Sequence, residues 1–166
     1  MQLDGWSLPV TRAQLDIWLA QETAHSGTEW QLGLFVRIEG PVDRDALEWA
    51  IRRVLQEAQP MRAAFSEVDG QVLQRVIDHE DVELTFYDLS DAPDPMGEAR
   101  ELAAVLQRTP MPLSGPLFSF TLFQTQADEF CLFACCHHIV VDGSGVALVG
   151  HRIASVYSAV VAGEPI

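Results

Sequence analysis

The sequence predicts an α+β fold in which a mixed, largely antiparallel sheet is covered by helices. Segments with apolar residues at helical spacing are interspersed with segments whose apolar residues recur at every second position. Turn signals at Asp69-Gly70 and around Gln126-Ala127-Asp128 each join two strand-like runs. With 166 residues, 48% of them hydrophobic and 20% charged, the chain can bury one core. We therefore expect a single domain or one lobe of a larger one.

The first predicted elements are a helix over residues 11–22 and a strand over residues 30–39. Thr11 and Gln14 have the spacing of a capping box, in which each side chain satisfies a backbone N–H at the helix start. The apolar residues at the spacing of one helix face are Leu15, Trp18 and Leu19. The strand is predicted because its apolar residues alternate, as in a half-buried strand. These residues are Trp30, Leu32, Leu34, Val36 and Ile38.

A second helix is predicted between Asp43, which is placed to cap it, and Gln59-Pro60. Its expected inner face consists of Leu47, Ala50, Ile51, Val54 and Leu55. Residues 61–77 then form a predicted hairpin, because both residues of the Asp69-Gly70 turn tolerate positive φ. Residues 82–89 alternate again and predict a further strand.

The remaining elements are a helix, a hairpin and a final helix. Residues 92–95 are interpreted as a loop and residues 97–108 as the third helix. Runs 117–124 and 130–136, rich in Phe, predict the second hairpin. The last helix is expected to begin at Ser144 or Gly145, to run to about Ala162 and to end at Gly163. The residues expected to step along it are Leu148, His151 or Arg152, Ser155 and Ala159.

The charge of the chain disfavours two classes of partner. With 10 Lys and Arg against 24 Asp and Glu, the formal net charge is −14, which repels a phosphate backbone and an anionic membrane surface. Apolar runs such as 130–136 are too short to span a bilayer. Residues 1–5 lack the pattern of a secretory signal. We expect no nucleic-acid or membrane partner and a cytoplasmic location.

The chain's chemistry-bearing residues cluster in the segment 135–144. His137 and His138 end a predicted buried strand, and Asp142 and Gly143 follow in the loop before the last helix. An imidazole has a reference pKa of about 6.5 and suits acid–base work near neutral pH. Asp142 could orient an imidazole or hold the loop by pairing with a buried cation. The Gly143 N–H near a helix start could stabilise developing negative charge. A structural role is nevertheless the commoner outcome for a histidine at a strand end.

A metal site is the other interpretation of this segment, because Cys135, Cys136, His137 and His138 are all zinc-ligand types. Neighbouring side chains of an extended strand point to opposite faces, so four consecutive residues cannot surround one tetrahedral ion. The sequence offers no second ligand pair, and we expect no metal. The three cysteines, including Cys131, are interpreted as buried thiols rather than a disulfide framework.

The string His137-His138-Ile139-Val140-Val141-Asp142-Gly143 resembles the HHxxxDG signature of the condensation domains of non-ribosomal peptide synthetases. Two further segments resemble motifs of this family and occur in the same order along the chain as in the family. Residues 8–18 resemble its opening S/T-x-A-Q-x-x-x-W motif, and residues 61–65 resemble the LRTxF end of its second motif. Some residues depart from the pattern, without removing a residue on which the chemistry is thought to depend. The departures are Glu57-Ala58-Gln59, Met61, Ala63, Ser144 and Gly145.

The resemblance implies a chloramphenicol acetyltransferase-like half-domain, with residues 1–166 as the amino-terminal lobe of a condensation domain whose carboxy-terminal lobe is absent. It implies that His138 removes the acceptor amine proton, or orients the amine and stabilises the tetrahedral intermediate. Gly143 would be an oxyanion donor, His137 would be structural, and Asp142 would pair with Arg62.

The implied partners are the carboxy-terminal lobe and the donor and acceptor carrier proteins. No cofactor would bind directly, since the substrates are carried on phosphopantetheine arms of the carrier proteins. The product would be an amide bond in the synthesis of an antibiotic or a siderophore.

Two alternatives remain open at the level of sequence. An epimerisation domain or an O-/N-acyltransferase of the same superfamily keeps the signature. The chain could also be a non-catalytic folded piece that self-associates, because an exposed apolar face between lobes favours a homodimer. We expect negligible turnover by the isolated chain. The donor, the acceptor, the stereochemical subtype and the natural product are not defined by these residues.

Overall fold

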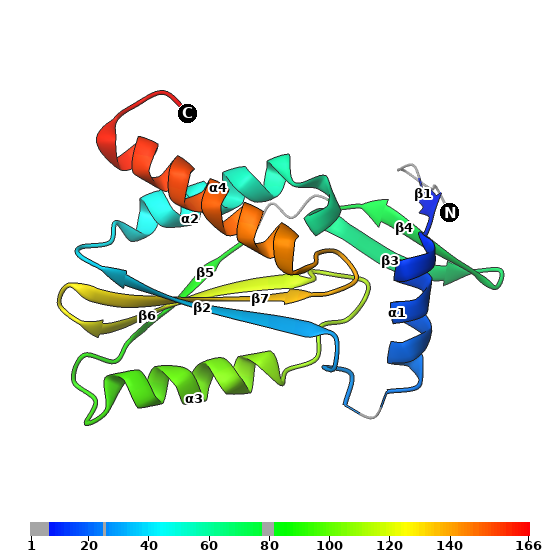
Figure 1. The fold of residues 1–166 in the computed structure, drawn as a ribbon, viewed down its shortest axis with the longest axis horizontal. Helices are drawn as coiled ribbons and strands as arrows, with labels where there is room; N and C mark the ends of the chain where they lie inside the picture. The colour runs from blue at the N-terminus through cyan, green and yellow to red at the C-terminus, as the bar shows by residue number, and fades with distance from the viewer. Residues whose placement is uncertain (1–6, 25, 78–81) are drawn as a thin grey trace.

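Two β-sheets form the framework of the computed structural model, which describes residues 7–24, 26–77 and 82–166 (Figure 1). The larger sheet has the strand order β2-β7-β6-β5, and the smaller has the order β1-β4-β3. Only the β5–β6 pair among the described pairings is parallel. The mixed, largely antiparallel character is confirmed, although the strands divide between two sheets. The bounds are β1 Ser7–Pro9, β2 Gln31–Glu39, β3 Ala63–Val68, β4 Gln71–Val76, β5 Leu84–Asp88, β6 Phe118–Gln126 and β7 Glu129–His137.

Helices cover both faces of the larger sheet. Figure 1 shows α2 and α4 on one face and α3 on the other, with α1 and the smaller sheet at one end of the molecule. The close approach of α3 to β2 depends on Gly33, since a Cβ there would lie 2.6 Å from a side-chain atom of Gln107. The helix bounds are α1 Arg12–Glu22, α2 Arg44–Glu57, η1 Gln59–Arg62, α3 Pro95–Gln107 and α4 Gly143–Ala162.

The local signals that predicted the first elements are confirmed. Thr11 and Gln14 form a capping box at the start of α1, and the Asp43 side chain accepts from the Ala46 N–H at the start of α2. The β3–β4 turn places Asp69 at φ 51° and Gly70 at φ 76°, which is the left-handed backbone that this hairpin requires.

One strand was not predicted, and two helices begin earlier than expected. The strand is β1, which pairs with β4 and whose three residues are too few to show a period. α3 begins at Pro95 rather than at residue 97, because proline is accommodated at the first helical position after the capping Asp94. α4 begins at Gly143, because Asp142 is its N-cap. Residues 1–5, considered above for a signal, lie outside the described part of the chain.

The core lies between the helices and the two central strands. The fully buried side chains include Phe123 and Leu122 on β6, Cys131 on β7 and Ile51 on α2. The predicted inner face of α2 is confirmed, since all five of its residues are buried. Burial of apolar area is the dominant favourable contribution to folding, so this layered core holds β7 in place.

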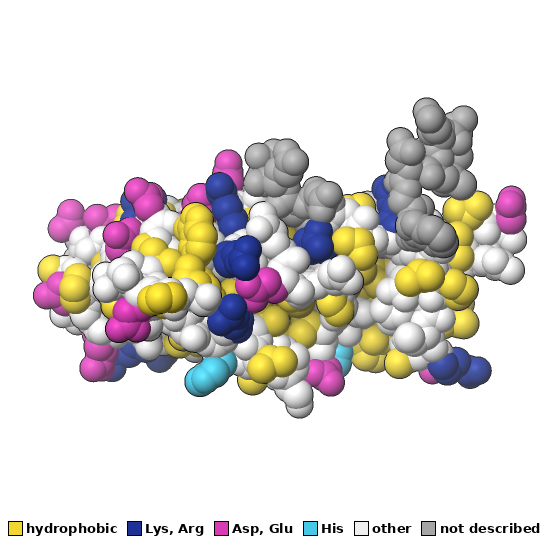
Figure 2. All heavy atoms as spheres, turned by 90° about the horizontal axis from the view of Figure 1, so that it is seen from above, with side chains coloured by type: hydrophobic (Ala, Val, Ile, Leu, Met, Phe, Trp, Pro, Cys, Tyr) yellow, Lys and Arg dark blue, Asp and Glu magenta, His cyan; other side chains and the backbone are white. Residues whose placement is uncertain are grey.

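α4 carries exposed apolar side chains, among them Leu148 and Val161. Ile153 and Val156 are its buried residues, while Leu148, one of the residues expected to step along the helix, is 72% exposed. Figure 2 shows the side of the molecule that bears α2 and α4, where hydrophobic side chains lie among charged ones. A surface of this kind usually marks a contact with another protein segment or domain.

By length and composition, α4 is also the one helix of the described residues that could cross a membrane. The expectation that every apolar stretch is too short for a bilayer was therefore wrong for this segment. Arg152 in its middle pairs with Glu57 of α2 at 3.1 Å, and the helix packs on α2. In this fold α4 is thus one layer of a globular unit.

Candidate active site

The signature residues lie where the buried strand β7 ends and the chain turns into α4. β7 is paired on both sides, with β2 and β6. At its end the His137 N–H donates to Leu117 O at 2.9 Å, and the His138 N–H donates to Trp30 O at 2.7 Å. Strands from both sides therefore fix the backbone of the two histidines.

His137 is fully buried and makes two hydrogen bonds. Its Nδ1 accepts from the Ile139 N–H at 3.1 Å, so its Nε2 carries the proton and donates to Gln21 Oε1 at 2.7 Å. Burial, together with the neighbouring His138, lowers the pKa of His137 to about 4. His137 is therefore neutral at pH 7, and its ring joins the signature loop to the end of α1.

His138 has a different environment from its neighbour. It is half-buried, and its ring lies edge-on to Trp30 with the ring centroids 6.1 Å apart. The hydrogen bonds of the described residues include none to its ring nitrogens. The difference in burial between the two rings leaves His138 as the histidine that a substrate could contact.

Asp142 and Gly143 form the start of α4. Asp142 Oδ1 accepts from the Gly145 N–H at 2.7 Å and so caps the helix. Gly143 is the first helical residue, and its N–H is one of the donors for which a helix offers no internal acceptor. Both residues are exposed. The positive end of α4 thus lies five residues after His138.

Arg62, expected to pair with Asp142, lies in η1. Its Nη2 donates to Gln56 O at 3.3 Å. The ion pairs between described residues do not join Arg62 to Asp142, and the Asp142 carboxylate caps α4. In this structure the loop is held by capping and by His137.

The neighbouring thiols have the properties of core residues. Cys131, Cys135 and Cys136 are all buried and unpaired. Burial raises the pKa of Cys136 to about 12, so this thiol stays protonated at neutral pH. A cysteine binds a metal ion as the thiolate, which Cys136 does not form at neutral pH.

Sequence reasoning missed the residues that position the histidines. Gln21 lies 116 positions before His137, and Trp30 contacts His138 from the segment before β2. Gln31 is buried, donates to Gln107 O and Thr109 O, and accepts from a backbone N–H. No local pattern marks these residues, because each acts through a contact distant in the sequence.

The family model of the condensation domain matches residues 6–166 of this chain. The dimodular nonribosomal peptide synthase of Bacillus subtilis (strain 168) is 33% identical over 156 residues, which are 93% of this chain and 7% of that protein. Enterobactin synthase component F of Escherichia coli (strain K12) is 33% identical over 161 residues, which cover 95% of this chain and 12% of that protein.

Solved structures show the same fold. The starter condensation domain of rhizomide synthetase RzmA has a TM-score of 0.91 and 29% identity, covering 96% of this chain and 39% of that chain. A mutant of that domain in complex with C8-CoA has a TM-score of 0.90 and 30% identity, covering 95% of this chain and 37% of that chain. With its fold, signature and matched residues, this chain belongs to the condensation domain family of non-ribosomal peptide synthetases, of which it spans the amino-terminal part.

Proposed function

We propose that this chain is the lobe of a condensation domain that supplies the catalytic histidine for amide-bond formation. The observation that carries the proposal is the different setting of the two signature histidines. His137 is buried and fully hydrogen-bonded, whereas His138 is half-buried at the end of β7. The donor is an acyl or peptidyl thioester and the acceptor is an aminoacyl group, both on phosphopantetheine arms of carrier proteins.

The proposed reaction is the transfer of the donor acyl group from sulfur to nitrogen. The acceptor nitrogen attacks the thioester carbonyl carbon, the nitrogen loses a proton, and the C–S bond breaks to release the thiolate. His138 takes the amine proton and returns it to the leaving sulfur, or it orients the amine and stabilises the intermediate. The solved relative in complex with C8-CoA supports an acyl thioester as one substrate.

The other signature residues have supporting roles in this proposal. The N–H of Gly143 at the start of α4 stabilises the oxyanion of the tetrahedral intermediate. Asp142 positions that N–H by capping the helix. Arg62 is a structural residue of η1, and His137 fixes the loop. No cofactor or metal takes part.

The second lobe is a required partner in this proposal. This chain spans 39% of the solved condensation domain chain, so most of that domain has no counterpart here. The exposed apolar residues Leu148 and Val161 of α4 support a contact with further protein. We place the complete enzyme in the cytoplasm. Without its second lobe, the 166-residue chain is expected to show negligible turnover.

The central test is the substitution His138→Ala in the complete condensation domain. The rate of amide formation is expected to fall about 10²- to 10⁴-fold, the usual contribution of general acid–base catalysis. Thioester and amine would be mixed with the enzyme, and the product would be identified by mass spectrometry. An ester or an epimer as the product would indicate another member of the superfamily.

His137→Ala is the comparison variant for this test. It removes two buried hydrogen bonds and is expected to lower the unfolding temperature as well as the rate. His138→Ala is expected to lower the rate with the unfolding temperature unchanged. Full condensation activity in a folded His138→Ala enzyme would refute the proposed role.

A further inference from the structure

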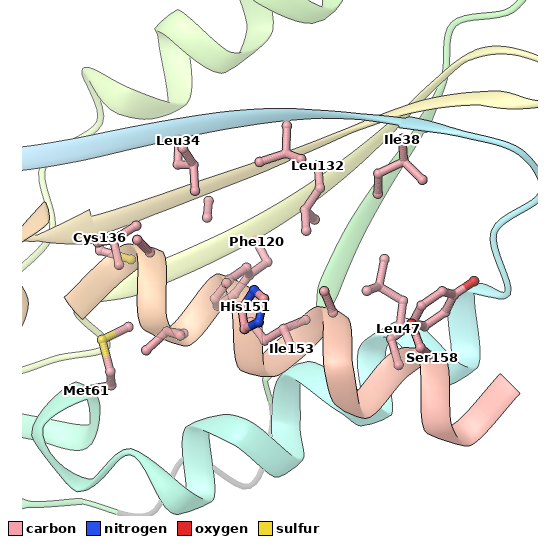
Figure 3. Close-up of a pocket in the computed structure, with 18 of the residues that line it drawn as sticks. Leu34, Ile38, Leu47, Met61, Phe120, Leu132, Cys136, His151, Ile153 and Ser158 are labelled. Atoms are coloured by element: carbon pink, nitrogen blue, oxygen red, sulfur yellow. The ribbon is translucent and has the colours of Figure 1, made fainter. Parts of the chain in front are cut away.

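The start of β2 carries a buried polar side chain, that of Gln31, which has no part in the reaction proposed above. Its side chain belongs to the core, since the residue is 6% exposed. Figure 3 shows Leu34 and Ile38 of β2 pointing into the apolar groove beside α4. Because neighbouring side chains of a strand alternate, Gln31 points to the opposite face of the sheet, where α3 lies (Figure 1).

The Gln31 amide binds three backbone groups of the segment that joins α3 to β6. Its Nε2 donates to Gln107 O at 2.7 Å and to Thr109 O at 3.0 Å, and its Oε1 accepts from the Met111 N–H at 2.9 Å. Gln107 is the last residue of α3, and the final carbonyls of a helix have no partner within it. The amide thus uses both its nitrogen and its oxygen, which fixes its orientation.

Trp30, the residue before Gln31, contacts His138 in two ways. Gln31 lies opposite His137 in the pairing of β2 with β7, and one step further Trp30 lies opposite His138. Trp30 O accepts from the His138 N–H at 2.7 Å. The two rings are edge-on, with their centroids 6.1 Å apart and an interplanar angle of 76°, which is a favourable arrangement of aromatic rings. Trp30 therefore holds both the backbone and the ring of His138.

The place of Trp30 depends in turn on the first residue of β2. β2 is an edge strand of the larger sheet, so its start is paired on one side, with β7. The Gln31 amide adds a second attachment, to the end of α3. Without this attachment, the start of β2 and the Trp30 carbonyl would be free to shift relative to α3.

We infer that Gln31 is a positioning residue for His138 and acts through Trp30. The inference rests on the proposed function. A general base works only within hydrogen-bond reach of the proton that it takes. A misplacement of about 1 Å can cost about 100-fold in rate, even when the altered residue lies away from the chemistry. Gln31 thus contributes to the rate although its own side chain is buried.

The first test is Gln31→Met in the complete condensation domain. Methionine has a similar length but cannot make the three hydrogen bonds of the amide. We expect kcat to fall about 10- to 100-fold, because His138 is displaced. The KM of each carrier-bound substrate should stay close to that of the wild type, because Gln31 does not contact substrate. Rates are measured at a temperature at which the variant remains folded.

Thr125→Val is the matched control, since it also removes buried hydrogen bonds without changing the shape of the side chain. Thr125 is 2% exposed, and its hydroxyl donates to Glu129 at the end of β7 opposite the histidines. This variant should have a lowered unfolding temperature, as Gln31→Met should, and the kcat of the wild type. An equal loss of kcat in both variants would assign the effect to stability and overturn the inference.

The route through Trp30 has a spectroscopic signature. The ring current of the indole shifts the proton resonances of the His138 ring, so Trp30→Leu should move these resonances. They are observed by NMR in a domain with isotope-labelled histidine and assigned by their absence in His138→Ala. Gln31→Met should move them in the same direction as Trp30→Leu, and Thr125→Val should not. Unmoved His138 resonances in a folded Gln31→Met domain would overturn the inference.

The two measurements distinguish failure of the inference from failure of the proposed function. Wild-type kcat and unmoved resonances in Gln31→Met, together with an inactive His138→Ala, would overturn the inference and leave the function intact. Full activity of His138→Ala would refute the function itself. A displaced His138 ring with wild-type kcat would count against both, because the position of the imidazole would then not matter for the rate.

Discussion

At the scale of single residues, the signature separates into a structural histidine and an accessible one. Strand alternation predicts that His137 and His138 point to opposite sides, and the structure shows one ring buried and the other half-buried. The buried ring is that of His137, which donates to Gln21 Oε1. The alternation was predictable from sequence, but the partner was not.

The proposed oxyanion role of Gly143 can be tested by removing its N–H alone. Gly143→Pro keeps the helix start, because proline is favoured at the first helical position and Asp142 is already extended, with ψ 178°. The rate of condensation is expected to fall about 10²- to 10³-fold, as for loss of one oxyanion donor. The rate constant of the complete domain would be measured at saturating donor.

Gly143→Ala is the control for this prediction, since it keeps the N–H and its Cβ would meet no atom within 4 Å. Its rate should remain close to that of the wild type. If Gly143→Pro and Gly143→Ala condense equally fast while both are folded, the N–H does not stabilise the intermediate.

At the scale of elements, the local signals were sufficient for most helices and strands but not for their assembly. The capping residues and the Asp69-Gly70 turn lie within a few residues of the backbone that they control, so they can be read directly. The division into two sheets depends on pairings between distant strands, such as β1 with β4. These pairings leave no mark in local periodicity.

The inner face of α4 shows why burial was harder to predict than helix position. Most of this helix is apolar, so its pattern does not single out one face, and Leu148, in the predicted series along the helix, is exposed. Ile153 and Val156 are the buried side chains of a helix that packs on α2, a contact distant in the sequence.

The role of Asp142 as a cap leads to a prediction about α4. Asparagine and aspartate are equally good N-caps, whereas loss of a cap costs about 1 kcal/mol. Asp142→Asn should therefore change the free energy of unfolding little, and Asp142→Ala should lower it by about 1 kcal/mol. Urea denaturation of the chain measures both. Equal destabilisation by Asn and Ala would mean that the charge matters, as in the ion pair with Arg62 that the sequence suggested.

At the scale of the whole molecule, the two sheets are connected through the signature. Gln21 of α1 binds the ring of His137 at the end of β7, and Gln14 of α1 donates to Ile139 O at 3.4 Å and to Gln74 of β4 at 3.2 Å. α1 thereby joins the smaller sheet to the larger one at the place where the candidate catalytic residues lie. The geometry around His138 thus depends on α1 as well as on the strands that flank β7.

This arrangement predicts that acid destabilises the whole fold through His137. Its pKa is about 4 in the folded chain and about 6.5 when unfolded, so the unfolded state binds the proton first as the pH falls. The stability that a neutral His137 provides is complete above pH 6.5 and is lost progressively between pH 6.5 and 4. Between pH 7 and 5 the free energy of unfolding should fall by about 2 kcal/mol.

Glu57 and Glu129 contribute little in this window, because Arg152 and Arg37 hold their pKa values below 4.5. His137→Gln, which cannot titrate, is the comparison variant. Its unfolding free energy should be lower than that of the wild type at pH 7 and nearly constant down to pH 5. If wild type and variant lose the same stability over this range, a group other than His137 takes up the proton. The link between α1 and β7 would then not be the acid-sensitive contact of the molecule.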